Sequence, residues 1–231
     1  MGKQPVTPNP RPSLHLYFHP FASFCQKVLV ALYENGTPFE PHFVDLGDPA
    51  SREAFLAIWP VGRMPVLVDR AANRPLPESS IIIEYLDHHY PGATPLIPRE
   101  FDEALETRLQ DRFFDLQVSE PMQKIVTDRI RPKGRGDPHG VDAARASLLT
   151  AYQLIERQME TRTWAIGETF TLADCSAGPA LFYADWVVPI THEHKHVRAY
   201  LDRLMNRPSF ARVVEEARPY RGLFPQPRAE D

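Results

Sequence analysis

The pattern of hydrophobic and polar residues divides the chain into two parts. Up to about residue 91, short apolar runs that predict strands alternate with stretches in which apolar residues recur at helical spacing. Strands are expected at residues 14–18, 39–46, 65–69 and 74–76, and helices at 24–33, 51–59 and 79–90. The order β-α-β-α-β-β-α predicts an α/β domain.

From residue 101 onward, the strand signals stop and only helical ones remain. Long helices are expected over residues 101–130 and 141–160, with a break rich in proline and glycine between them, and further helices begin near 172, 197 and 208. The expected fold class is therefore an α/β domain followed by an all-α domain. The expected boundaries are a flexible extension at 1–13, the first domain at 14–92, a linker at 93–101 and the helical domain at 102–231.

Composition indicates a soluble globular chain and argues against several other classes. The 231 residues are 43% hydrophobic and 24% charged, which is sufficient for a packed core. A net charge of −4 does not favour a nucleic-acid partner. No apolar run approaches the roughly 20 residues of a membrane-spanning helix, and residues 1–12 lack the apolar core of a secretory signal. With two cysteines only, we expect a reducing compartment, the cytoplasm.

Proline is unusually abundant, with 24 residues in the chain. Several prolines lie near the two ends: Pro5, Pro8, Pro10 and Pro12 in the first part, and Pro219, Pro225 and Pro227 in the last. We expect both ends to be extended or mobile.

The first predicted strand passes into a helix at residues 21–28. Ser23 and Gln26 have the S-x-x-Q spacing of a capping box, which would stabilise the helix by about 1 kcal/mol. The same hydroxyl, beside the free N–H groups of a helix start, could also stabilise a thiolate. Cys25 is either a small buried apolar residue or a nucleophile with a lowered pKa.

Two other segments carry groups that suit a peptide-like ligand. Pro65 at the start of an apolar strand predicts a cis Met64–Pro65 bond, which would present the Met64 amide and carbonyl at a strand edge. Glu78 and Ser79 begin a helix; they either cap it or hold the ammonium and carboxylate groups of an amino acid.

Two further motifs have structural interpretations. Thr171 and Asp174 form a second capping box, and we expect it to be structural. His192, His194 and His196 alternate along the chain, a spacing that fits neither one helix face nor a usual ligand set, so no metal site is expected.

Taken together, these segments resemble the cytosolic glutathione S-transferases over residues 14–220. Residues 62–67, Gly-Arg-Met-Pro-Val-Leu, resemble the segment before that family's cis-proline. The Glu78-Ser79 pair resembles the pair that holds the γ-glutamyl group, and residues 170–174 resemble the capping motif of the helical domain. The resemblance implies a thioredoxin-like N-terminal domain, glutathione as co-substrate, and a homodimer.

The resemblance is to bacterial, serine-type, zeta- and theta-like classes and implies Ser23 as the catalytic residue. In one alignment Ala22 takes the place of the activating serine instead, and Tyr17 is a rival because tyrosine-type classes use this region. The serine hydroxyl would donate a hydrogen bond to the thiolate. Lowering a thiol pKa from about 8.5 by about two units corresponds to about 2.7 kcal/mol.

The expected reaction is conjugation of the glutathione thiolate to small hydrophobic electrophiles, as in detoxification. The expected substrate-binding residues are Arg63, Met64, Pro65, Glu78 and Ser79 for glutathione, and Phe21, Phe113 and Trp186 for the electrophile. Two alternatives stay open: a glutathione-dependent thiol reductase that uses Cys25, and a non-catalytic glutathione-binding or interaction protein.

Overall fold

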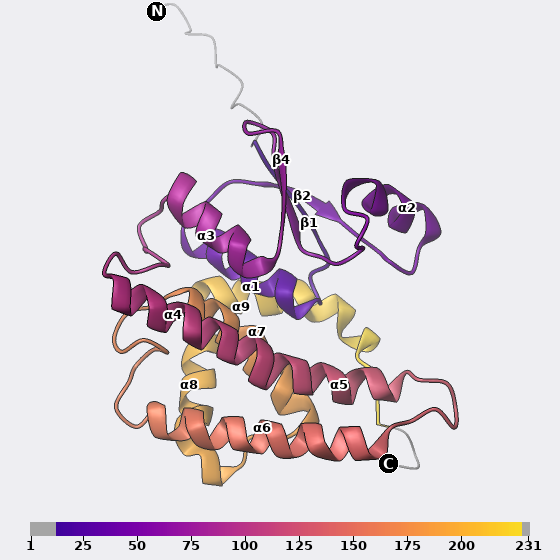
Figure 1. Cartoon of the computed structure of the whole chain (residues 1–231), viewed down its shortest axis with the longest axis vertical. Coiled ribbons are helices and arrows are strands. Elements are labelled where there is room, and N and C mark those ends of the chain that lie inside the picture. The colour runs from indigo at the N-terminus through magenta and orange to yellow at the C-terminus, as the bar shows by residue number, and fades with distance from the viewer. Residues whose placement is uncertain (1–12, 228–231) are drawn as a thin grey trace, which may run out of the picture.

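The computed structural model describes residues 13–227, which form one mixed β-sheet and a larger group of helices (Figure 1). The extension expected over residues 1–13 lies outside the described residues, apart from Ser13. All strands of the sheet come from residues 14–77, and residues 101–223 supply the helices of the second part.

The sheet has the strand order β2-β1-β3-β4. The strands are β1 (Leu14–Phe18), β2 (Glu40–Phe43), β3 (Val66–Asp69) and β4 (Arg74–Pro77). β1 is parallel to β2 and antiparallel to β3, and β3 is antiparallel to β4. A parallel pair needs a crossover connection, and helix α1 (Ser23–Glu34) supplies it.

The two faces of the sheet are covered differently, because successive side chains of a strand point to opposite sides. Leu14 and Leu16 are buried in the main core, on the side where α1 and α3 (Ser79–His89) lie between the sheet and the helical domain (Figure 1). Tyr17 belongs to a smaller cluster on the other face, where α2 (Pro49–Ile58) contributes Phe55.

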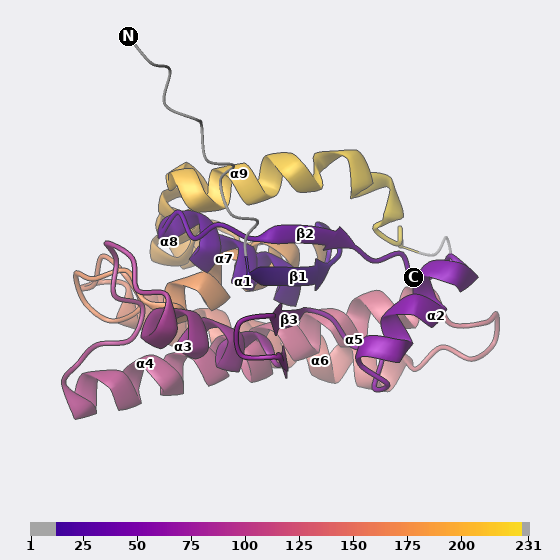
Figure 2. The ribbon, with the colours of Figure 1, turned by 90° about the horizontal axis from the view of Figure 1, so that it is seen from above.

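The helical domain begins with a long continuous helix. Its segments are α4 (Phe101–Phe113), a π-helical stretch (Phe114–Ser119) and α5 (Glu120–Arg129). The helices that follow are α6 (Pro138–Gln158), α7 (Leu172–Val187), α8 (Lys195–Asn206) and α9 (Pro208–Ala217), with short 3₁₀ turns at His192–His194 and Arg218–Leu223. Seen from above, α9 runs on one side of the strands and α4 on the other (Figure 2).

Helix α7 is central to the helical domain and packs against α1 of the first domain. The capping box predicted at its start is confirmed, since the Thr171 N–H donates to Asp174 Oδ2 over 2.8 Å. Asp174 is fully buried and also accepts hydrogen bonds from Tyr200 at 2.6 Å and from the Ala165 N–H at 2.8 Å. A buried carboxylate with this many donors is structural.

Other local predictions need correction. The capping box at Ser23 and Gln26 is absent, because Ala22 is the N-cap of α1 and no side chain caps it. α2 is capped by Asp48 and starts two residues before the helix expected over 51–59, and β2 is four residues long, shorter than the strand expected over 39–46. α6 starts inside the predicted break, because Asp137 caps it and Pro138 fits its first turn.

The C-terminal end is more ordered than the prolines suggested. Pro219 lies within the 3₁₀ turn at Arg218–Leu223, and the next residue after that turn, Phe224, packs in the partly buried margin of the core. Over residues 13–227, we find no helix that combines the length and apolar character needed to cross a membrane.

Candidate functional site

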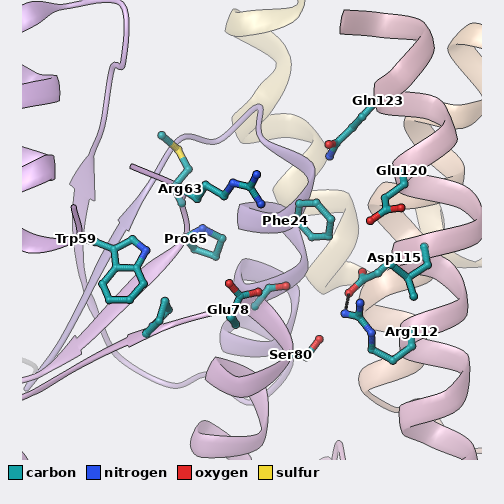
Figure 3. A pocket seen from close by; sticks show the side chains of 14 residues that line it. Phe24, Trp59, Arg63, Pro65, Glu78, Ser80, Arg112, Asp115, Glu120 and Gln123 are labelled. Atoms are coloured by element: carbon teal, nitrogen blue, oxygen red, sulfur yellow. Dashed lines mark hydrogen bonds and ion pairs between the residues drawn. The ribbon is translucent and has the colours of Figure 1, made fainter. Parts of the chain in front are cut away.

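A cavity of about 290 Å³ lies between the two domains (Figure 3). One wall comes from the segment before β3 and from the start of α3, and the opposite wall comes from α4, the π-helical stretch and α5. Phe24 of α1 lies between the two walls. The polar groups of this first cavity therefore come from both domains.

The wall before β3 presents both backbone and charge to the cavity. The Met64–Pro65 bond is cis, as predicted, and Gly62 adopts the left-handed conformation with φ of 70° that favours glycine. Arg63, Met64 and Pro65 all line the cavity. Within residues 13–227, the exposed Arg63 guanidinium has no acidic partner, so it is available to an anionic ligand.

The start of α3 is the second polar element of this wall. Glu78 has a φ of 70°, a conformation that is uncommon for any residue but glycine and that concentrates at functional sites. Ser79 is the first residue of the helix and is buried at 7% exposure. Since no side chain of the described region caps α3, its first N–H groups remain available to an anion in the cavity.

A buried charge cluster lies next to the cavity. Its centre is Lys27, which is 1% exposed. Lys27 Nζ lies 2.6 Å from Asp111 Oδ1 and 2.9 Å from Asp115 Oδ2, and it donates to Ser80 Oγ over 2.9 Å. Ser80 in turn donates to Asp111 Oδ2 over 2.7 Å. The cluster joins α1 and α3 to the helical domain.

Asp115 connects this Lys27 cluster to the cavity, whose lining includes it. Burial raises the pKa of Asp115, an effect that Lys27 opposes and the neighbouring Asp111 reinforces. Arg112, half exposed at the cavity wall, reaches Asp115 at 3.2 Å (Figure 3). Asp115 lies in the π-helical stretch, a form that is rare and frequent at functional sites.

A second cavity of about 210 Å³ lies beside the first. Its walls are mainly apolar and aromatic: Phe21, Met122, Val126, Tyr183, Leu223, Phe224 and Pro225. Gln123 lines both cavities, and Ser23 and Phe24, the first two residues of α1, face the second and the first respectively. The two cavities therefore meet at the N-terminus of α1.

The local packing explains why Gln26 does not cap α1. Its side-chain amide is fully buried and donates to Tyr183 Oη and to the Pro20 carbonyl, each over 2.9 Å. Ala22, in the N-cap position, has no side-chain donor, and its backbone N–H donates to the His19 carbonyl over 3.0 Å. Ser23 is the nearest hydroxyl along α1, and its side chain faces the second cavity.

The two rival residues, Tyr17 and Cys25, line neither of the two cavities. Tyr17 points to the outer face of the sheet, where it stacks on His42 with 4.5 Å between ring centres. Cys25 is 0% exposed, and burial raises the pKa of its thiol to about 12. A buried thiol with a raised pKa is a poor nucleophile, so this geometry does not favour a reductase that uses Cys25.

The predicted binding residues fall into three groups. Arg63, Met64, Pro65, Glu78 and Ser79 line the first cavity, Phe21 lines the second, and Trp186 lies behind it with its ring centre 4.8 Å from that of Phe224. The expectation that Phe113 contacts the electrophile needs correction, because Phe113 lines a separate groove against α6. One residue turns an α-helix by about 100°, so Phe113 leaves the cavity face that Arg112 occupies.

Several lining residues were not predicted. They are Phe24, Trp59, Pro77, Ser80, Arg112, Asp115, Leu116, Glu120 and Gln123. The sequence holds a signal for part of this set, since Arg112, Leu116, Glu120 and Gln123 recur at the three- and four-residue spacing of one helix face. Among residues 13–227, no three histidine, cysteine or acidic side chains are grouped to hold a metal ion.

Comparison with known families agrees with both parts of this architecture. A family model described as the N-terminal domain of glutathione S-transferase matches residues 16–94, and one described as the C-terminal domain of glutathione S-transferase matches residues 138–203. The expected fold class, a thioredoxin-like domain followed by a helical domain, is confirmed.

Individual proteins show the same relationship. The glutathione S-transferase-like protein LUC7 of Fusarium is 31% identical over 68% of this chain and 71% of its own. A stringent starvation protein A homolog of Coxiella burnetii is 27% identical over 90% and 94%. The crystal structure of a glutathione S-transferase from Methylobacillus flagellatus with glutathione bound superposes with a TM-score of 0.79 at 25% identity, covering 87% and 98%. The chain therefore belongs to the glutathione S-transferase family.

Proposed function

We propose that this protein is a glutathione transferase that joins the thiolate of glutathione to small hydrophobic electrophiles. The observation that carries the proposal is the first cavity, whose groups match the charges of glutathione. Ser79 and the start of α3 suit the γ-glutamyl carboxylate, and Glu78 suits the neighbouring ammonium group. The backbone of Met64 suits the cysteinyl peptide, and Arg63 suits the glycyl carboxylate.

This orientation brings the cysteinyl sulfur to the N-terminus of α1, where the two cavities meet. We propose that the Ser23 hydroxyl donates a hydrogen bond to the thiolate, with help from the free N–H groups of the helix. The thiolate then attacks an electrophile in the second, aromatic cavity: a carbon–sulfur bond forms while a leaving group departs to solvent with the bonding electrons, or a π bond of the electrophile opens and is protonated by water. The chemistry needs the proton of the thiol to leave to solvent.

Titration of the bound thiol tests this function. The thiolate absorbance of glutathione bound to the full chain should report a pKa about two units below that of the free thiol, because the anion is stabilised at α1. Ser23→Ala should raise that pKa, whereas Ser147→Ala, an exposed serine of α6, should leave it unchanged. No lowering of the pKa in the unmodified protein would disprove the transferase mechanism.

A second candidate is a protein that binds glutathione without catalysis. Ala22 at the N-cap of α1 favours it, because that position lacks a side-chain donor for the thiolate. In this case glutathione binds and its thiol keeps the pKa it has in solution, so the titration separates the two candidates.

We also propose a homodimer and a cytoplasmic location. Phe101, Leu105 and Leu109 follow one another at four-residue spacing on α4, and each is more than half exposed, as is Ile81 of α3. A two-fold contact through this stripe would set the first domain of one subunit against the helical domain of the other. The two free cysteines suit a reducing compartment.

A further inference from the structure

His19 follows strand β1 and holds the turn that leads into α1. Its ring nitrogen Nδ1 accepts the Phe21 N–H over 3.1 Å, and its carbonyl accepts the Ala22 N–H over 3.0 Å. An imidazole nitrogen that accepts a hydrogen bond carries no proton, so the neutral ring has its proton on Nε2. The turn in this form therefore depends on the neutral state of His19.

The other side chains that bond to this turn do not titrate near neutral pH. Gln26 Nε2 donates to the Pro20 carbonyl and Tyr183 Oη donates to the Phe21 carbonyl, each over 2.9 Å. Burial raises the pKa of Tyr183, so its hydroxyl keeps its proton. Of these side-chain hydrogen bonds, the one at His19 Nδ1 is therefore the one that a mild change of pH can break.

The ring of His19 is partly buried between two aromatic side chains from other elements. Its centre lies 5.0 Å from that of Phe43 in β2 and 4.8 Å from that of Tyr220 in the C-terminal 3₁₀ turn. His19 therefore joins the start of α1 to the edge strand and to the C-terminal end of the helical domain.

The charged and titratable groups around His19 leave it neutral at pH 7. Burial lowers the pKa of His19, and Asp45, which follows β2, opposes this effect only in part. The Cys25 thiol contacts the His19 backbone, and burial raises the pKa of that thiol to about 12, so it does not change state in the same range. Tyr220 brings a phenol rather than an ion at this pH.

The turn controls one wall of the second cavity. Phe21 lines that cavity, and its ring meets the ring of Tyr183 edge-on with 5.4 Å between centres. A protonated Nδ1 carries a hydrogen that faces the Phe21 N–H, and a flipped ring brings a C–H there, so neither form can accept the bond. The Phe21 backbone must then turn away, and its ring moves with it.

We propose that His19 is a positioning residue that shapes the second cavity through Phe21, and that its protonation in mild acid takes this aromatic wall apart. The inference goes beyond the proposed function, because it concerns the shape of the cavity whatever ligand fills it. The wall is intact at neutral pH and is lost as the pH falls below about 6.5.

Two variants separate the acceptor of His19 from its ring. His19→Asn keeps an oxygen that can accept the N–H two residues further on, as in an Asx turn, and this side chain does not titrate. His19→Phe keeps a ring against Phe43 and Tyr220 but removes the acceptor. His139→Asn, at an exposed histidine of α6, is the matched control.

The affinity of the full chain for S-benzylglutathione relative to glutathione measures the second cavity, since only the benzyl group differs. Calorimetric titration at about pH 8 and about pH 5.5 should show this ratio falling about 2- to 10-fold in acid, the effect of one lost hydrogen bond, in the parent and in His139→Asn. His19→Asn should keep the high ratio at both pH values, and His19→Phe should have the low ratio at both.

A ratio that falls equally in the parent and in His19→Asn would overturn the inference and assign the pH dependence to another group. A second measurement needs no ligand: the Phe21 amide resonance of the ¹⁵N-labelled chain should shift over the same pH range in the parent and stay in place in His19→Asn. If neither ligand binds, the proposed function fails and this resonance alone decides, because a Phe21 amide that does not shift in the parent would overturn the inference.

Discussion

Two charged clusters fasten the same helix, α1, to the helical domain, one in its first half and one at its end. In the first half, Lys27 contacts Asp111 and Asp115. At the end, Glu34 forms a two-pronged ion pair with Arg207, and Ser209 donates to Glu34 over 2.8 Å.

The two clusters differ in how their charge is balanced. Glu34 and Arg207 neutralise each other, and the guanidinium carbon lies 3.9 Å from the centre of the Phe170 ring. Lys27 faces two carboxylates. A second cation, Arg112, contacts one of them, Asp115, and lines the first cavity. The comparison teaches that similar ion pairs can differ in what they face: the Glu34 pair faces no cavity, whereas Asp115 and Arg112 of the Lys27 cluster line the first cavity, where a ligand would contact them.

The largest effect is expected when the Lys27 cluster loses its cation. Lys27→Met should lower the free energy of unfolding by about 3–5 kcal/mol, because it leaves the buried Asp111 carboxylate without a cation. It should also weaken glutathione binding, since Asp115 and Ser80 line the cavity. Urea unfolding and calorimetric titration measure the two effects.

Lys124→Met is the matched control for Lys27→Met. Lys124 pairs with Asp137 at a partly exposed position, so its loss should cost no more than about 1 kcal/mol. Equal costs for the two variants would refute the role given to burial.

A smaller effect, on stability alone, is expected at the Glu34 pair. Arg207→Met should lower the free energy of unfolding by about 2 kcal/mol, through the lost hydrogen bonds and the lost stacking on Phe170. Glutathione affinity should stay at the parent value, because Arg207 is not a lining residue of either cavity. A loss of affinity in Arg207→Met would remove the distinction between the clusters.

A third pair, His15 and His42, contains no carboxylate, and we expect it to have the smallest effect on stability. His15 Nδ1 lies 2.7 Å from His42 Nε2 on the outer face of the sheet. Burial lowers the pKa of His15, Arg70 and His42 lower it further, and Glu40 opposes them. The unfolded chain therefore takes up a proton at this residue near pH 6.5, where the folded protein resists it.

Stability should consequently fall as the pH decreases through about 6.5, until the lowered pKa of His15 in the folded protein is reached. His15→Gln should show a shallower fall than the parent protein when urea unfolding is followed between pH 8 and pH 5. Parallel curves for the two proteins would rule out His15 as a source of acid sensitivity.

The strands and helices could be predicted because their signals are local. Apolar periodicity located β1, β3, α3 and the helices after residue 101, and the Thr171–Asp174 capping box lies within one helical turn. The same S/T-x-x-polar spacing wrongly predicted a capping box at Ser23, because the side chain of Gln26 bonds to Tyr183, 157 residues away. A local motif does not reveal such a long-range contact.

The candidate site was predictable on one wall only. Arg63, Met64, Glu78 and Ser79 stand at strand and helix starts, where sequence signals are strong. The opposite wall depends on how α4 and α5 are turned, and the π-helical stretch between them changes that turn. Lys27 was missed because it is a lysine on the buried face of an otherwise apolar helix, and its partners lie in another domain.

The π-helical stretch from Phe114 to Ser119 also bears on how this chain can diverge. A π-helical turn holds more residues than an α-helical one, so the deletion of a single residue there could restore a regular helix. Such a deletion would rotate everything on one side by about 100° relative to the other. Either Asp115 would leave Lys27 or Gln123 would leave the junction of the cavities. We therefore expect descendants of this chain to tolerate substitutions along α4 and α5 more readily than a change in their length.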